Sequence, residues 1–316
     1  MAFMKRALVT GASGFVGGHL VPYLYEQGLE IWASHHRRIK RFPFRIHWRR
    51  ADLTRQSETS ALVRESRPDY IFHLAAQAVP SVSWQERVAT FEANTLASIY
   101  LLEAVVRWAP KARVILASTS HVYGRTFLKK KRPRETDLAD PVSPYGGSKL
   151  LMELAALNFV RQNSVDVIIV RPFNWVGTGQ NPSYVFYNFC CQLALMEAKK
   201  QPPVLKVGNI DVVRDFIHAR DGARGYWLVA QKGKKWEIYN MGSGRGLLLR
   251  DAVQFLKKES RIPFKIKSEA GRKPKNDLPW IVSDPSKLKG LGWRPRESIR
   301  EALREILDEQ RSKAAH

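Results

Sequence analysis

Two side chains spaced four residues apart, Tyr145 and Lys149, form the pattern in this sequence that is best suited to chemistry. They fall in the run PYGGSK at 144–149. If this run opens a helix, the phenol and the ammonium group lie on the same helix face. Because a nearby positive charge favours phenolate over phenol, we expect Lys149 to lower the pKa of Tyr145. Tyr145 would then donate or accept a proton near neutral pH.

The neighbours of this pair in the chain give it weight, since Tyr-x-x-x-Lys alone is common by chance. A hydrophobic strand predicted at 113–118 leads into the hydroxyl-bearing residues Ser118, Thr119 and Ser120. In parallel α/β sheets, ligands bind beyond the carboxyl ends of the strands. We therefore expect Thr119 to face the same site as Tyr145.

A glycine-rich motif near the N-terminus has the context of a dinucleotide fingerprint. It follows an apolar strand at 7–10 and opens a helical pattern that ends at Gly28. Glycines there permit a tight turn, close approach to a pyrophosphate and packing of the helix on the strand, while the helix N-terminus favours negative charge. The alternative is a glycine-rich turn with a structural role only. The cofactor-binding residues predicted in this segment are Gly11, Ser13, Gly14, Phe15, Val16 and Gly17.

Basic residues after the second predicted strand, 30–34, indicate the form of the dinucleotide. The acidic residue that would bind a free ribose 2′-hydroxyl is missing there, and Arg37 lies in a basic segment that suits a 2′-phosphate. We therefore expect NADP(H) in preference to NAD(H). A basic loop that only faces water is the alternative.

Two later strand ends are also expected to meet the cofactor. Asp52 follows a short strand at 47–48, where a carboxylate can meet the adenine amino group, and small residues follow the strand at 70–74. We interpret His73, inside that strand, as a packed residue and not as a catalyst. The predicted contacts here are Asp52, Leu53, Leu74, Ala75 and Ala76.

Alternation of buried strands with helices predicts an α/β fold with a doubly wound parallel sheet. Long helices are expected at 91–108 and 145–162, and a further strand at 167–171. Later elements are shorter, with helices at 219–231 and 297–311, so we expect a smaller interleaved C-terminal lobe. The predicted division is a dinucleotide-binding domain at 1–170 plus about 211–240, and a substrate lobe at about 171–210 plus 241–316.

Composition narrows the class of protein. The 316 residues include 52 Lys+Arg against 29 Asp+Glu, a net charge of +23 that attracts anionic substrates or polyanions. The basic runs do not alternate with aromatic residues, so we do not expect a nucleic-acid partner.

No apolar run is long enough to span a membrane, and the first strand begins almost at once, so we expect a cytoplasmic protein. Cys190 and Cys191 are interpreted as reduced core thiols, without a disulfide scaffold or zinc site.

With these residues in view, the chain resembles the extended short-chain dehydrogenase/reductases that act on nucleotide sugars. Within that family, the segments 174–180 and 206–216 are most similar to GDP-6-deoxy-4-keto-mannose reductases, which make GDP-rhamnose, and GDP-mannose 4,6-dehydratases are close relatives. The motifs that carry the resemblance are Gly11-x-x-Gly14-x-x-Gly17, Asp52-Leu53, His73-Leu74-Ala75-Ala76, Ser118-Thr119-Ser120, Tyr145-x-x-x-Lys149, Arg171-Pro172-Phe173-Asn174 and Arg214-Asp215-Phe216.

The resemblance implies roles for the catalytic set. Tyr145 would exchange a proton with the sugar C4 oxygen, Thr119 would hydrogen-bond that oxygen, and Lys149 would bind the nicotinamide ribose. A guanidinium is well shaped to hold a diphosphate, although an ion pair is the alternative for Arg214. The predicted substrate contacts are Thr119, His121, Asn174, Lys206, Arg214 and Arg272.

His121 departs from the pattern of the dehydratases, which carry a glutamate there to remove the C5 proton. A reductase needs no such base, so we expect His121 to line the site, with a role as base left open. The implied reaction is NADPH-dependent reduction of the C4 ketone of a GDP-linked 4-keto-6-deoxy sugar. The alternatives are a 4,6-dehydratase or C4 epimerase, and a non-catalytic dinucleotide- or RNA-binding protein. The resemblance also implies a homodimer joined through the helices at 91–108 and 145–162.

Overall fold

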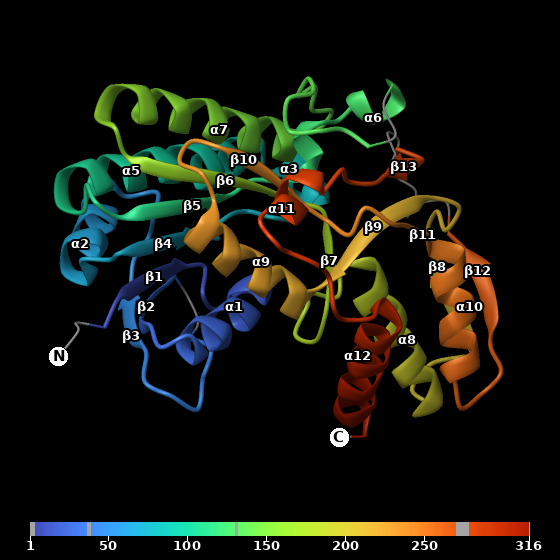
Figure 1. Cartoon of the computed structure of the whole chain (residues 1–316). Helices are drawn as coiled ribbons and strands as arrows, with labels where there is room; N and C mark the ends of the chain where they lie inside the picture. Colours follow the sequence, from blue (N-terminus) through green and yellow to red (C-terminus); the bar gives the residue numbers. More distant parts are fainter. Residues whose placement is uncertain (1–3, 37–38, 130–131, 270–277, 316) are drawn as a thin grey trace.

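A seven-stranded parallel sheet forms the centre of the computed structural model, which describes residues 4–36, 39–129, 132–269 and 278–315 (Figure 1). The strand order is β10-β6-β5-β4-β1-β2-β3, so the chain reverses direction across the sheet between β1 and β4. This topology confirms the predicted doubly wound sheet. The strands are β1 (Arg6–Thr10), β2 (Glu30–His35), β3 (His47–Arg50), β4 (Tyr70–His73), β5 (Arg113–Ala117), β6 (Asp166–Pro172) and β10 (Ile238–Met241).

Two hydrophobic cores lie on opposite faces of this sheet. Successive side chains of a strand point to opposite faces, and in β1 the side chains of Ala7 and Val9 enter one core while Leu8 enters the other. Because both faces are covered, inner strands such as β1, β5 and β6 read as largely apolar runs, whereas the edge strand β3 does not. The first core is covered by α1 (Phe15–Glu26) and α9 (Ala219–Lys232), and the second by α2 (Gln56–Ser66), α5 (Ala97–Trp108) and α7 (Pro144–Asn163).

The helix predicted at 91–108 is confirmed, but it contains a π-helical turn that was not predicted. The segment comprises the end of α4 (Arg87–Phe91), a π-helical turn η1 (Glu92–Leu96) and α5. The wider turn carries Asn94, which is buried against α7. The apolar periodicity of the sequence did not predict this turn. The turn is accompanied by polar contacts with another helix, which an apolar pattern does not report. The short helices nearby are α3 (Pro80–Gln85), the 3-10 turn η2 (Ser120–Val122) and α6 (Thr126–Lys129).

A smaller lobe with its own core lies beside the carboxyl edge of the sheet (Figure 1). Its strands form one sheet of β11-β9-β13 with β7 on β9, and a second sheet of β12-β8. The chain returns to the central sheet for α9 and β10 before finishing in this lobe, so the predicted interleaving is confirmed. The elements are β7 (Asn174–Val176), α8 (Val185–Glu197), β8 (Val204–Val207), β9 (Val213–His218), β11 (Gly246–Leu248), α10 (Leu249–Glu259), β12 (Lys265–Ser268), β13 (Trp280–Ile281) and α12 (Ile299–Ala314). The short helix α11 (Ser286–Gly290) packs on β10 instead, and its Leu288 enters the first core of the central sheet.

The division of the chain into lobes by residue number stays a prediction. By strand pairing, β9 joins the smaller sheet, although the expected boundary at about 211 placed it with the dinucleotide-binding domain. Within the described ranges, no helix combines the length and apolar character needed to cross a membrane.

Candidate active site

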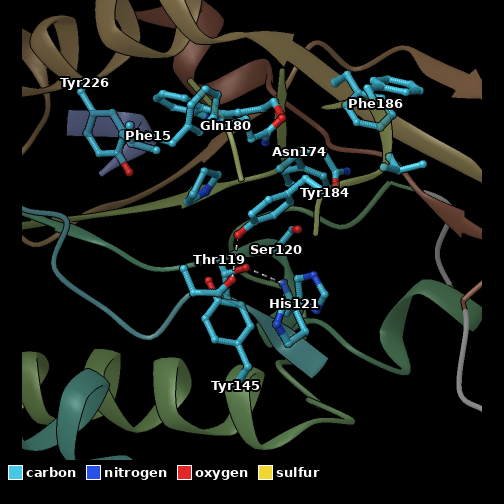
Figure 2. Close-up of a pocket in the computed structure, with 18 residues that line it drawn as sticks. Phe15, Thr119, Ser120, His121, Tyr145, Asn174, Gln180, Tyr184, Phe186 and Tyr226 are labelled. Carbon is cyan, nitrogen blue, oxygen red and sulfur yellow. Dashed lines mark hydrogen bonds between the residues drawn. The ribbon is translucent and has the colours of Figure 1, made fainter. Parts of the chain in front are cut away.

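A cavity of about 200 Å³ lies at the carboxyl edge of the central sheet, against the smaller lobe (Figure 2). Loops after parallel strands converge at this edge, which is where ligands of such sheets bind. The lining residues come from the start of α1, the loops after β4, β5 and β6, strands β7 and β9, and helices α7, α8 and α9. They are Phe15, Val16, Ala78, Pro80, Thr119, Ser120, His121, Tyr145, Pro172, Phe173, Asn174, Trp175, Gln180, Tyr184, Val185, Phe186, Phe216 and Tyr226.

The local sequence fixes the start of α7, which positions Tyr145. Ser143 is the N-cap residue and its side chain accepts a hydrogen bond from the Gly146 amide at 3.1 Å. Pro144 occupies the first helical position, where its missing N–H costs no hydrogen bond. The prediction that 144–149 opens a helix is therefore confirmed.

Thr119 lies at the end of β5 and faces the same cavity as Tyr145 (Figure 2). Its side-chain oxygen accepts a hydrogen bond from the backbone amide of His121 at 3.2 Å, which caps the short turn η2. It is also close enough to the Tyr145 phenol to lower the pKa of that group. The two hydroxyl groups therefore meet at one wall of the cavity.

The expected lowering of the Tyr145 pKa by Lys149 is wrong. Burial of the Tyr145 phenol raises its pKa above the ordinary value, and the Thr119 side chain lowers it by less. The Lys149 amine donates instead to the carbonyl oxygen of Ala117 at 2.7 Å. Spacing along a helix placed both groups on one face but did not aim the amine at the phenol. Tyr145 is thus a neutral phenol at pH 7, which suits a proton donor.

Lys149 is 2% exposed, and burial lowers its pKa to about 8. The nearby carboxylate of Glu153, one helical turn further along α7, opposes this shift. Glu153 is itself held by Arg171 in a buried ion pair at 2.6 Å and accepts a hydrogen bond from Ser118. The buried carboxylate therefore keeps the Lys149 pKa higher than burial alone would.

The π-helical turn joins α7 to the loop after β4. The Asn94 side-chain amide donates to the Ser148 hydroxyl at 2.9 Å and to the Gln77 carbonyl at 3.0 Å. Thr95 donates to the Ser148 carbonyl at 2.8 Å. These bonds fix the helix beside Lys149, and π-helical turns are frequent at functional sites.

His121 is a neutral imidazole in this site. Burial and the positive charge of Arg214 lower its pKa to about 4. Its ring meets the Tyr145 ring edge-on, with 5.5 Å between the centroids. A histidine with so low a pKa is a weak base, but it can still donate and accept hydrogen bonds.

The turn between β1 and α1 fits a dinucleotide pyrophosphate. Gly11 has φ +69°, and a Cβ there would lie 2.8 Å from the Ala75 nitrogen, so only glycine brings the two loops this close. A Cβ at Gly17 would lie 2.6 Å from the Cα of Ala12. The helix begins after Gly14 and has no acidic residue in its first turn, which leaves its positive end suited to an anion.

His73 is a structural residue, as expected. Its two ring nitrogens hydrogen-bond the Thr10 hydroxyl at 2.8 Å and the Ser98 hydroxyl at 2.9 Å, and burial lowers its pKa to about 3. The neutral ring therefore ties β1 and β4 to α5.

The other predicted cofactor contacts stay predictions. The Asp52 carboxylate accepts hydrogen bonds from the amide and hydroxyl of Thr54, and Leu53 packs into the core. Leu74 and Ala75 lie against the Gly11 turn, and Ala76 follows them. Arg37 lies outside the described residues.

Only some of the predicted substrate-binding residues lie together at the cavity. Asn174 lines the cavity while its amide donates to the Asp215 carbonyl at 3.0 Å, and Arg214 is near enough to affect His121. Lys206 is absent from the lining residues, and its amine pairs with Glu269 at 3.4 Å. Arg272 lies outside the described residues. These binding roles stay predictions.

Several residues of the site were missed at the sequence level. Glu153 follows Lys149 at the same four-residue spacing that singled out the Tyr145 pair, so that spacing was a usable signal. No such spacing marked Asn94, Tyr184 and Tyr226, because they belong to helical segments that are far from Tyr145 in the sequence.

Comparison with known proteins agrees with this geometry. The model of the NAD dependent epimerase/dehydratase family matches residues 7–242. The chain is 29% identical over 310 residues to GDP-6-deoxy-D-mannose reductase of Pseudomonas aeruginosa, a match covering 98% of each chain. It is 27% identical to GDP-mannose 4,6-dehydratase of Yersinia enterocolitica, covering 96% of this chain and 93% of that protein. The predicted resemblance is thereby confirmed.

The similarity extends to three dimensions. The solved structure of RMD from Pseudomonas aeruginosa complexed with NADPH matches with a TM-score of 0.85 at 28% identity, covering 98% of this chain and 100% of that one. The likeness therefore includes the smaller lobe as well as the central sheet.

If Lys149 binds the nicotinamide ribose, as the family resemblance implies, its pKa of about 8 predicts a pH dependence of dinucleotide binding. The amine is charged below that pH and loses its proton above it, so we expect NADPH affinity to fall by about tenfold as pH rises through about 8. Fluorescence titration of NADPH across this range measures the effect.

The Lys149→Met variant should bind weakly at every pH, whereas Lys111→Met, which alters an exposed lysine, should behave as wild type. A wild-type affinity that does not change through pH 8 would contradict the assignment.

Proposed function

Because the chain belongs to the NAD-dependent epimerase/dehydratase family, we propose that it reduces the C4 ketone of a GDP-linked 4-keto-6-deoxy sugar with NADPH, giving a GDP-rhamnose-type product. That the chain is an NAD(P)-dependent enzyme acting on nucleotide sugars follows from the family and from relatives that match its full length. The observation that carries the finer proposal is the neutral Tyr145 phenol beside Thr119, both of which line the cavity.

The residues of the chain supply positioning and a proton. Tyr145 and Thr119 present hydroxyl groups that can donate to one carbonyl oxygen and stabilise the negative charge that grows there. Tyr145 then gives its proton to the alkoxide, because its neutral form is the populated one at pH 7. A bound NADPH supplies the hydride for the ketone carbon. Lys149 binds the nicotinamide ribose and does not itself act as the proton donor.

The nucleotide half of the substrate is assigned to the Arg214 side of His121. Arg214 offers N–H donors for a diphosphate, and Asn174 lines the cavity. Lys206 and Arg272 keep their predicted roles in this proposal. Guanine as the base is supported by the relatives named for GDP-linked sugars.

A 4,6-dehydratase is the second candidate, supported by the similarity to the Yersinia enzyme. Elimination of water needs a base for the C5 proton, and His121 stands where dehydratases carry glutamate. Because its pKa is lowered to about 4, His121 is poorly suited to take that proton at neutral pH. The reductase is therefore preferred. A non-catalytic binder has no chemical reason to keep Thr119, Tyr145 and Lys149 together.

Three attributes of the protein are part of the same proposal. We expect NADP(H) in preference to NAD(H), supported by the basic residues after β2 and by the NADPH complex of a similar structure. We expect a cytoplasmic location, as the sequence indicated. We also expect a homodimer, supported by exposed apolar side chains on helices that contact one another, namely Val88 on α4 and Leu151 and Leu154 on α7.

Tyr145→Phe tests the proton donor. Removal of the hydroxyl should lower kcat by roughly a hundredfold or more, because the general acid is lost. NADPH affinity should stay within about twofold of wild type, since the ring remains. Steady-state kinetics and NADPH titration measure the two effects. Tyr25→Phe, at an exposed tyrosine stacked on Phe44, is the control, and an unchanged kcat in Tyr145→Phe would refute the role.

Substrate choice separates the reductase from the dehydratase. With the GDP-linked 4-keto-6-deoxy sugar, we expect one NADPH consumed for each molecule of sugar reduced, with kcat/KM about tenfold or more above that for NADH. With GDP-mannose and no added cofactor, we expect no 4-keto product. Absorbance at the NADPH band and mass spectrometry of the sugar follow both reactions. Formation of a 4-keto sugar from GDP-mannose would instead establish the 4,6-dehydratase activity.

Leu154→Glu tests the homodimer. Leu154 is 50% exposed, so a charge there should leave the fold of one chain intact. In an apolar interface the same charge is desolvated, and we expect the dimer to weaken by about tenfold or more. Light scattering across a concentration series measures the dissociation constant. Leu138→Glu, at another exposed leucine, should have no effect, and a wild-type chain that is monomeric at all concentrations would exclude the dimer.

A further inference from the structure

We infer that Tyr184 is a further substrate-contacting residue, whose hydroxyl oxygen accepts a hydrogen bond from a hydroxyl group of the bound sugar. The inference rests on the proposed function and adds a specificity-determining residue to it. Tyr184 lies outside the predicted site and outside every motif that carried the family resemblance.

The position of Tyr184 is fixed by the backbone of the smaller lobe. It is the N-cap residue of α8, with its carbonyl oxygen accepting from the Asn188 amide at 2.9 Å. Its own amide donates to the Asn181 carbonyl at 3.0 Å. Figure 2 shows its ring pointing from this lobe across the cavity, with the hydroxyl on the side of Thr119.

The Tyr184 hydroxyl is directed by a hydrogen bond to the other lobe. It donates to the carbonyl oxygen of Ala78 at 3.0 Å, a residue in the loop after β4 that also lines the cavity. A tyrosine hydroxyl has one proton, and here that proton is committed to Ala78. What remains for a ligand is an oxygen lone pair, so Tyr184 presents an acceptor.

This acceptor complements the groups on the facing wall. Tyr145 and Thr119 can donate to a ketone oxygen, which has no proton of its own. An acceptor opposite them cannot bind the ketone and instead suits a hydroxyl on a neighbouring carbon of the sugar. The cavity thus distinguishes the oxidised carbon from its hydroxylated neighbours by the direction of the hydrogen bonds.

Charge and burial are consistent with this role. Tyr184 is close enough to Tyr145 that it raises the pKa of the Tyr145 phenol, so the two groups share one cavity. Burial also raises the pKa of Tyr184 itself. The residue is therefore a neutral acceptor at working pH, and it adds no negative charge beside the proton donor.

Helix α8 provides a matched control three residues further on. Tyr187 is buried, but its hydroxyl hydrogen-bonds the Lys313 amine at 3.0 Å and it does not line the cavity. Tyr184→Phe and Tyr187→Phe each remove one phenol oxygen from the same helix. Only the first removes an oxygen that faces the substrate.

The test measures kinetics and binding in both variants. In Tyr184→Phe, we expect KM for the GDP-linked keto sugar to rise about three- to tenfold with kcat within about threefold, as for loss of one uniform hydrogen bond. Affinity for GDP alone and for NADPH should stay within about twofold. Tyr187→Phe should change none of these quantities. An unchanged KM in Tyr184→Phe would overturn the inference, and so would an equal loss of GDP affinity, which would indicate a purely structural bond between the lobes.

Failure of the proposed function gives a different result. If wild type does not reduce the keto sugar, calorimetry with GDP-mannose and with GDP tests the contact between Tyr184 and the sugar independently. Loss in Tyr184→Phe of the extra affinity that the sugar confers on GDP-mannose would support the contact. Equal affinities in wild type and variant, or no binding of GDP-mannose by wild type, would overturn it.

Discussion

The removal of Tyr145 and Lys149 from water is the constraint on which the rest of the site depends. Burial favours the neutral form of each group, which keeps the phenol protonated and lowers the pKa of the amine to about 8. The buried carboxylate of Glu153 moderates the effect on the amine, and Arg171 compensates the charge of that carboxylate in turn. Since a buried charge without a partner is costly, the four groups form one interdependent unit.

The turn between β1 and α1 also packs closely against the loop after β4. The loop of Gly11 lies against Ala75, and the adjacent strands β1 and β4 are joined through His73. A side chain at Gly11 would push these two loops apart and open the turn between β1 and α1. The packing of two strand ends therefore sets the position of the turn relative to the cavity.

The smaller lobe closes the site through a few polar anchors. The buried Asp215 carboxylate accepts hydrogen bonds from the backbone and side chains of Ser243 and Ser283, which joins β9 to the segments on either side of it. The neighbouring residue, Arg214, is thereby held on the side of the cavity where His121 lies. From the opposite side, Tyr184 reaches across to Ala78. The cavity exists because both lobes contribute walls to it.

The sequence by itself determined the first six strands of the central sheet, the glycine turn after β1 and the convergence of Thr119 with Tyr145, whereas β10 and α2 were not predicted. These features depend on local periodicity, on glycines at fixed spacing and on the rule that parallel strands present their carboxyl ends together. Only the tertiary structure decided the protonation of Tyr145, the direction of the Lys149 amine and the presence of Asn94 and Tyr184 at the site. The physical reason is that a pKa depends on desolvation, and a contact between distant helices on packing, neither of which is encoded in the spacing of neighbouring residues.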